Sequence, residues 1–299
     1  DRPAAPYLKW ERNDQFNAGV DFGILNGRIR LTADWYSKLS KDILLDLAQP
    51  THMGFPSLLM NSGEIKNTGI EFTISADPFT GKGFSWHTDV TLSHNKGTFN
   101  SIPTANHRQQ QAGSFQNQLF QMIEGEKLGT FWGYTFGGIW QEDEVNAPFV
   151  DANGQTNGKT NGEVYKVVAG NSKYVDTNKD GVLNDADQGI IGCGQPTFNW
   201  GWNNSFNYKN FDFSFFMVGF HGFDIYNATH QMGFNTVSGQ NMAAVTPMRD
   251  FLNRWTPTNT NTDVPGFVQG GTENKVFSSR FVENGGFIKM KSITLGYTL

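Results

Sequence analysis

Residues 15–38 alternate apolar and polar side chains along two runs, which are separated by Asn26 and Gly27. The apolar positions are Phe16, Ala18, Val20, Phe22 and Ile24 in the first run and Ile29, Leu31, Ala33 and Trp35 in the second. Because successive side chains of a β-strand point to opposite faces, this pattern predicts two strands joined by an Asn-Gly hairpin with a type I′ turn. Each run is about ten residues long, the length that a tilted strand needs to cross a bilayer. The apolar face of this hairpin therefore meets either a protein core or lipid.

The same alternation returns further along the chain, at residues 70–76, 84–92, 198–208, 211–217 and 287–299. The connections between these stretches are of two kinds. Short turns are expected at residues 26–27, 77–83 and 209–210, and long loops at about 39–66, 95–197 and 221–285. Such long loops are uncommon in compact domains. Outer-membrane barrels, in contrast, combine short periplasmic turns, long extracellular loops and strands of about ten alternating residues. The connections therefore favour a transmembrane antiparallel β-barrel.

The composition agrees with an all-β protein and excludes other classes. The 299 residues include 26 Phe, 8 Trp and 34 Gly, and aromatic side chains are enriched in strands. No run of about 18 apolar residues occurs, so no transmembrane helix is expected. The net charge of −5 provides no basic surface for nucleic acid, so no nucleic-acid partner is expected.

The polar face of the predicted strands has two interpretations. It carries Asn17, Asp21, Arg30, Asp34, Glu71, His87 and Asp89. In a barrel these side chains line the lumen, and in a soluble sandwich they face solvent; the loop asymmetry and strand length favour the barrel. Because no strand keeps an unpaired edge in lipid, seven strands predict only part of a larger barrel. We expect further strands upstream of Asp1 and downstream of Leu299.

Several stretches, taken in order and spacing, resemble one protein family. They are residues 61–72 (NSGEIKNTGIEF), 124–125 (EG), 133–134 (GY), 138–141 (GIWQ), 176–181 (DTNKDG), 191–192 (IG) with Pro196, 253–260 (NRWTPTNT) with Asp263 and Pro265, and 293–297 (ITLGY). Each stretch alone is a weak motif. Together they are similar to the SusC/RagA-type TonB-dependent outer-membrane transporters, and they cover nearly the whole chain.

This resemblance implies a plugged barrel of roughly 22 strands in the outer membrane of a Gram-negative bacterium. It implies uptake of glycans or peptides, energy from TonB, and a SusD-like surface lipoprotein that captures the substrate. Residues 1–299 would then be the C-terminal portion of the barrel domain, contacting the lipid bilayer and the rest of the barrel. The plug, the TonB-contacting segment and the final strands would be absent, so TonB would act through the missing N-terminal part.

Residues 176–187 have the ligand spacing of a calcium-binding loop. Oxygen ligands occupy loop positions one, three, five, nine and twelve, a Gly stands at six, and position seven offers its carbonyl. The candidate Ca²⁺ ligands are Asp176, Asn178, Asp180, Val182, Asn184 and Asp187. The last ligand is an Asp where a bidentate Glu is usual. The alternative is a loop whose carboxylates only cap backbone amides.

Trp132, Tyr134 and Trp140 lie in a Gly-rich part of the longest loop and are candidates for stacking on a substrate. The alternative is that they pack inside the loop. No His-Glu-x-x-His, Gly-x-Ser-x-Gly or phosphate-binding Gly-rich motif occurs, so no enzyme activity is predicted. The sequence therefore leaves two functions: part of a TonB-dependent nutrient importer, or a soluble all-β calcium-dependent glycan-binding module.

Overall fold

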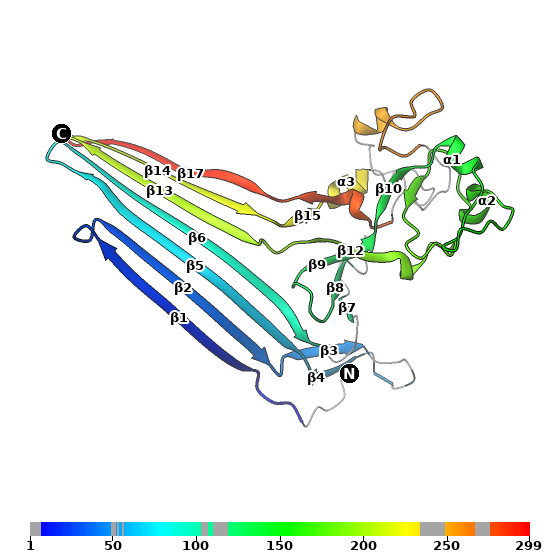
Figure 1. Cartoon of the computed structure of the whole chain (residues 1–299), viewed down its shortest axis with the longest axis horizontal. Coiled ribbons are helices and arrows are strands. Elements are labelled where there is room, and N and C mark those ends of the chain that lie inside the picture. The colour runs from blue at the N-terminus through cyan, green and yellow to red at the C-terminus, as the bar shows by residue number, and fades with distance from the viewer. Residues whose placement is uncertain are drawn as a thin grey trace.

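A computed structural model describes residues 7–48, 52, 54–55, 57–102, 107–109, 119–233, 249–266 and 276–299. Seven antiparallel strands form one long sheet in the order β1-β2-β5-β6-β13-β14-β17 (Figure 1). These strands are β1 (Arg12–Ile24), β2 (Ile29–Lys41), β5 (Glu64–Thr80), β6 (Phe84–Ser101), β13 (Phe198–Tyr208), β14 (Phe211–His221) and β17 (Phe287–Tyr297). The sheet is open at β1 and β17, which confirms the prediction of a partial barrel.

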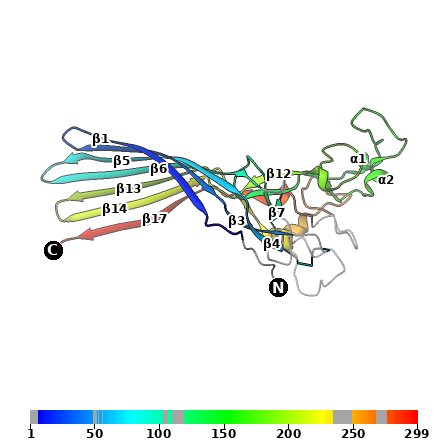
Figure 2. The ribbon, with the colours of Figure 1, turned by 90° about the horizontal axis from the view of Figure 1, so that it is seen from below.

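The short turns and the long connections lie at opposite ends of the sheet, as the sequence predicts. In Figure 1 the short turns lie at the left, where β17 also ends, and the long connections lie at the right. Figure 2 shows the same division from below. The turn at Lys209 is a two-residue hairpin, because Tyr208 pairs with Phe211, and Lys209 has a φ of 52°.

The strand register assigns the polar and apolar side chains to opposite faces. Val90 lies across from Ile74 and Trp202, whereas Asp89 lies across from Ser75 and Asn203. The second face holds all of the side chains that the sequence predicts to be lumenal, which confirms that they share one face of the sheet: Asn17, Asp21, Arg30, Asp34, Glu71, His87 and Asp89.

Among the described residues, no second layer covers the apolar face of the sheet. Val20 and Phe22 are 61% and 58% exposed, and Ile293 and Leu295 are 63% and 73% exposed. An apolar surface of this extent would be unfavourable in water, but it is the expected outer face of a membrane barrel. A soluble sandwich would need a second sheet on this face, and the described residues contain none there.

The first hairpin differs from its prediction at the turn. Ile24 pairs with Ile29, so the connection contains the four residues from Leu25 to Arg28 rather than two. Asn26 and Gly27 have positive φ values of 56° and 81°, as expected, but Leu25 also has one, of 53°. Local hydrogen bonds close this turn: the Gly27 amide donates to the Ile24 carbonyl at 3.1 Å, and the Arg28 amide donates to the Leu25 carbonyl at 3.2 Å. The Arg28 carbonyl also accepts a 2.8 Å hydrogen bond from the Asp77 amide at the end of β5.

Several strands extend beyond their predicted ends. β5 continues through a bulge between Ala76 and Phe79, so the predicted turn at 77–83 shortens to residues 81–83. β6 extends to Ser101 because its last residues pair with the start of β5, where Ser101 lies across from Glu64. They also contact the following loop. The Phe99 amide donates to the Glu126 carbonyl at 3.1 Å, and the Leu128 amide donates to the Gly97 carbonyl at 3.0 Å.

The long connections contain secondary structure of their own. A hairpin, β3 (Leu44–Ala48) and β4 (Ser57–Asn61), follows β2. The other short strands are β7 (His107–Gln109), β8 (Phe120–Met122), β9 (Thr130–Tyr134), β10 (Phe136–Ile139), β11 (Ser172–Tyr174), β12 (Gln188–Cys193), β15 (Asp224–Tyr226) and β16 (Val282–Asn284). The helices are α1 (Glu142–Asn146), α2 (Asn161–Tyr165) and α3 (Ala228–Gly233), with 3-10 turns η2 (Asp185–Asp187), η5 (Arg249–Asn253) and η7 (Ser279–Phe281).

We call the described parts of 119–197, 222–233, 249–266 and 276–286 the loop unit. Its buried apolar side chains form two hydrophobic cores, and a third core joins Met122 of the loop unit to Phe99 and Ile102. One core contains Leu119, Phe131 and Phe277, and another contains Val264 and Phe281. No described helix has both the length and the apolar character needed to cross a membrane.

Candidate functional site

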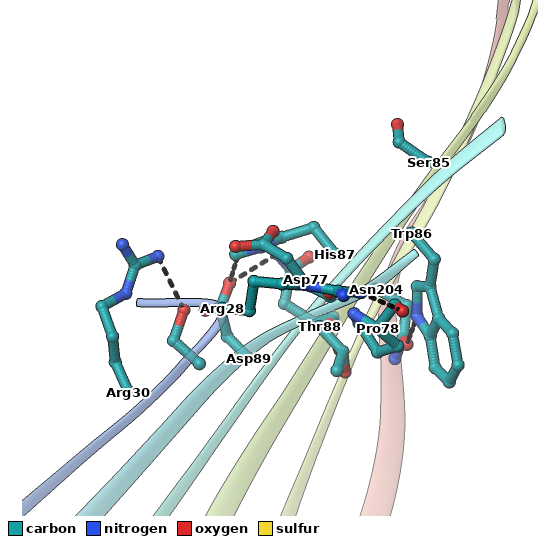
Figure 3. Close-up of polar contacts among 12 residues, drawn as sticks. Arg28, Arg30, Asp77, Pro78, Ser85, Trp86, His87, Thr88, Asp89 and Asn204 are labelled. Atoms are coloured by element: carbon teal, nitrogen blue, oxygen red, sulfur yellow. Dashed lines mark hydrogen bonds and ion pairs between the residues drawn. The ribbon is translucent and has the colours of Figure 1, made fainter. Parts of the chain in front are cut away.

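A polar cluster on the lumenal face lies near the short turns (Figure 3). The His87 ring lies between two carboxylates, with Nδ1 at 2.7 Å from Asp77 Oδ1 and Nε2 at 2.9 Å from Asp89 Oδ2. A neutral imidazole has one N–H, so both hydrogen bonds form only with the doubly protonated ring. Asp77 belongs to the bulged end of β5, and His87 and Asp89 belong to β6. The cluster therefore connects the β5–β6 turn to the barrel wall.

Arg28 connects the same region to the first hairpin. Its guanidinium donates to the carbonyls of Asp77 and Pro78, as Figure 3 shows. Two residues later, in β2, the Arg30 guanidinium donates to Ser75 Oγ of β5 at 3.4 Å. These contacts bind the wall strands to one another, and they leave the polar face available to whatever occupies the lumen.

The predicted calcium loop is closed by its own side chains. Asp176 Oδ2 accepts from the Gly181 amide at 2.9 Å and from the Tyr165 hydroxyl at 2.8 Å. The two Asp187 carboxylate oxygens accept from the amides of Thr177 and Asn184, each at 2.9 Å. The structure thus brings the ends of the loop together, as the calcium spacing requires.

The remaining contacts in the loop agree with the alternative in which its polar side chains cap backbone amides. Asp180 Oδ1 accepts from the Val182 amide at 2.7 Å, and Asn184 Oδ1 accepts from the Ala186 amide at 2.8 Å. The Val182 carbonyl accepts from the Asn184 amide group at 3.1 Å, and Asn178 donates to Asp180 Oδ2 at 2.9 Å. Within the described chain, no three His, Cys, Asp or Glu side chains converge to hold a metal ion.

One atom of the loop lacks a partner. Asp176 Oδ1 is buried and accepts no hydrogen bond from any described residue. A buried carboxylate oxygen without a partner is costly, and a cation would satisfy it. Burial, the hydrogen bond to Asp176 and the nearby carboxylates raise the pKa of Tyr165, so its hydroxyl remains a donor to Asp176. Calcium at this loop stays a prediction.

We expect Ca²⁺ to stabilise the full-length protein through this loop. At a Ca²⁺ concentration of about 100 times Kd, the stabilisation is about 2.7 kcal/mol. Thermal unfolding in Ca²⁺ and in chelator measures it, and Asp176→Asn should remove most of the difference. Asp151→Asn is the matched control, because Asp151 Oδ1 accepts from two backbone amides in a neighbouring loop that lacks the calcium spacing. Equal stability in Ca²⁺ and in chelator would contradict the prediction.

The predicted stacking aromatics pack within the loop unit. Trp140 is only 6% exposed, with the Tyr165 ring at 5.7 Å and the Lys173 ammonium 4.7 Å over its own ring. Tyr134 lies 5.8 Å from the Tyr174 ring, and Trp132 is half-buried in β9. These positions follow the packing alternative, and a role of Trp132, Tyr134 or Trp140 in substrate binding stays a prediction.

A different aromatic lines a hollow in the loop unit. Trp255 follows η5 and faces the start of α1, where its indole N–H donates to Gln141 Oε1 at 3.0 Å. In the sequence both residues belong to stretches that resemble the transporter family. Neither was predicted as a binding residue, because 114 residues separate them and no local pattern joins them.

Comparisons with known proteins agree on one group. The family described as "TonB dependent receptor-like, beta-barrel" matches residues 2–178. TonB-dependent receptor P3 of Formosa agariphila is 32% identical over 296 residues, which cover 98% of this chain and 27% of that protein. TonB-dependent receptor SusC of Bacteroides thetaiotaomicron is 26% identical over 295 residues, which cover 97% of this chain and 26% of that protein.

The solved structures of the RagAB peptide transporter have the same fold. One matches with a TM-score of 0.73 at 20% identity and covers 99% of this chain and 30% of the RagAB chain. The "closed-closed" state of the RagAB peptide importer matches with a TM-score of 0.74 at 20% identity, covering 100% and 30% of the two chains. This chain thus spans less than a third of the length of the relatives that it matches.

Proposed function

The chain belongs to the TonB-dependent receptor-like β-barrel family, and from this premise we propose that it supplies barrel wall and substrate-facing extracellular loops to a nutrient importer. It is a β-barrel protein of the outer membrane of a Gram-negative bacterium. The imported substrate is an oligosaccharide or a peptide. A SusD-like surface lipoprotein delivers it, and TonB acts through a part of the parent protein outside this chain.

The division of the sheet into two faces carries this proposal. One face presents apolar side chains that no other described layer covers, and the other presents polar side chains that include carboxylates and amides. A wall with these two faces separates lipid from a water-filled lumen. The loop unit, with hydrophobic cores of its own, stands at the end of the wall that is opposite to the short turns. Rigid loops in this position suit the capture of a substrate before it enters the lumen.

The name of one similar protein bears on the substrate class. RagAB is described as a peptide importer, whereas SusC and receptor P3 are described only as TonB-dependent receptors. A transport role requires no catalytic residues, and the proposal assigns none. The soluble calcium-dependent module is disfavoured, because it would expose the apolar face of the sheet to water.

Growth of the parent bacterium tests the proposal. A strain without the full-length gene should lose growth on one class of oligosaccharide or peptide as sole nutrient. The intact gene should restore growth, but only in cells that retain TonB and the lipoprotein. Undiminished growth of the deletion strain on all oligosaccharide and peptide sources would contradict an import role.

A further inference from the structure

The loop unit contains an open hollow of ≈ 760 Å³ between α1 and residues 255–261. Its walls include Gln141, Glu142, Asp143, Trp255, Pro257 and Asn261. In Figure 1 these two segments, green and orange, lie at the end of the molecule opposite to the short turns. Ligand pockets commonly have volumes of about 300–1,000 Å³ and combine an apolar surface with a few polar groups.

Two glycines support the Trp255 ring from one side. A Cβ built on Gly170 would lie 2.6 Å from Trp255 Cε3, and a Cβ built on Gly266 would lie 3.4 Å from the same atom. Gly170 has a φ of 92°, which favours glycine for a second reason. The glycines are held together by a 2.8 Å hydrogen bond from the Gly266 amide to the Gly170 carbonyl. The lack of a side chain at Gly170 thus lets the indole approach the backbone closely, beside Gly266.

Gln141 holds the indole in place from α1. Its Oε1 accepts from the Trp255 indole N–H at 3.0 Å, and its Nε2 donates to the carbonyls of Ile139 and Thr260 at 3.1 and 3.4 Å. Gln141 is also the N-cap residue of α1, and its backbone amide donates to Glu144 Oε2 at 3.1 Å. Gln141 thus uses both of its amide protons and one acceptor site of Oε1 within the protein, and its role is to orient Trp255.

The polar side chains at the rim of the hollow differ from Gln141, because they are not engaged within the described protein. Glu142, Asp143, Asn146 and Asn261 are exposed and make no side-chain hydrogen bond to any described residue. Two of them are carboxylates, which only accept, and two are amides, which both donate and accept. The hollow therefore combines one fixed aromatic surface with a mixed set of unused donors and acceptors.

This set of groups favours a polyhydroxylated ligand. A sugar hydroxyl donates and accepts, so it pairs with carboxylates and amides alike, and the C–H face of a sugar ring packs on an aromatic ring. A lysine or arginine side chain has no acceptor and would leave the amide donors unused. An extended peptide is commonly recognised through a free strand edge. The backbone at this wall is already paired, because Thr256 and Asn259 exchange hydrogen bonds of 3.1 and 2.9 Å.

We propose that this hollow binds one ring of a neutral oligosaccharide, with the sugar C–H face on Trp255 and the hydroxyls on Glu142, Asp143, Asn146 and Asn261. The proposal rests on the proposed import function and assigns its substrate to the glycan class. The loop unit then holds a sugar site at the extracellular end of the barrel wall.

Binding of the full-length protein in detergent to an array of neutral hexose and pentose oligosaccharides tests the proposal, with tetralysine as the cationic comparison. The unaltered protein should capture at least one oligosaccharide. Trp255→Ala should reduce its affinity by about tenfold or more, the scale of an aromatic hot spot. Trp255→Phe should retain part of the binding, because a ring remains on the glycine support.

Asn261→Ala provides a variant that should fold normally, because its side chain is exposed and makes no described hydrogen bond. It should also weaken capture. Asn153→Ala is the matched control: this amide is exposed, its side chain makes no described hydrogen bond, and it lies outside the hollow, so capture should be unchanged. Circular dichroism of each variant verifies the fold.

Three outcomes would overturn the sugar site: capture of no oligosaccharide, equal capture by Trp255→Ala and the unaltered protein, or capture of tetralysine that is lost in Glu142→Gln/Asp143→Asn. Each can occur while the gene still supports growth on a peptide or oligosaccharide. In that case the import function stands and only the sugar site fails. Loss of import function would appear in the growth test instead.

Discussion

Replacement of Phe281 by alanine is expected to lower the free energy of unfolding of the loop unit by about 3–5 kcal/mol, the usual cost of removing a buried aromatic side chain. Phe281 is 0% exposed and packs with Val264, Tyr226 and Phe251. The His230 ring meets it edge-on at 5.8 Å. These neighbours come from two segments of the loop unit, 222–233 and 249–266, so the cavity would loosen the contacts of both with the segment that contains Phe281.

The surroundings of Phe281 exclude water. Burial raises the pKa of Tyr226 to about 12, and the Tyr226 hydroxyl donates to Gln231 Oε1. The Phe281 carbonyl also accepts a 2.8 Å hydrogen bond from the Asn227 amide. Because this region is tightly connected, we expect little collapse around the cavity and a cost near the upper end of the range.

Hydrogen exchange of the full-length protein measures the effect locally, since protection should fall across the loop unit and remain unchanged in the wall strands. Leu252→Ala is the matched control. Leu252 is a large apolar residue of the same unit but is 78% exposed, so its truncation should change stability by less than about 0.5 kcal/mol. A similar loss of protection in both variants would contradict the assignment of Phe281 to the core.

Replacement of Val90 by arginine is also expected to lower the stability of the protein strongly. Val90 lies in the middle of β6, and its cross-strand neighbours on the same face are Ile74 and Trp202. On the lipid face of a barrel, an arginine near the bilayer midplane costs about 2–4 kcal/mol. Val20→Arg in β1 should act in the same way, because Val20 pairs with Ala33 on the same face.

The neighbouring position provides the control for Val90→Arg. Thr91 lies across from Thr73 and Gly201 on the lumenal face. Thr91→Arg places the same charge one residue further along the strand but into water, so its cost should be much smaller. Denaturant titration of the full-length protein in lipid vesicles compares the two variants. Equal destabilisation would contradict the division into lipid and lumenal faces.

The wall of the barrel was predictable from local sequence, because its pattern has a period of two residues. The alternation in residues 15–38 and the Lys209 turn require only neighbouring side chains, and the structure confirms both strand pairs. The first turn was only partly predictable. The positive φ values of Asn26 and Gly27 follow from residue type, but the positive φ of Leu25 does not, and the contact of Arg28 with Asp77 joins residues that are far apart in the sequence.

The loop unit was not predictable in the same way. Its strands are short, some only three residues long, such as β8 and β15, so they show no period. Trp132, Tyr134 and Trp140 were singled out because they are aromatic and close to glycines. Whether such a residue faces a ligand or a core depends on what packs against it, and for Trp140 this is Tyr165 and Lys173.

The sequence by itself determined the barrel wall, the family resemblance and the calcium spacing of residues 176–187, because each is written in residues close together along the chain. Only the tertiary structure decided which aromatic lines a hollow. Trp255 does so because Gln141, Gly170 and Gly266 meet it from distant parts of the chain. An orientation set by long-range contacts leaves no periodic trace in the residues around it.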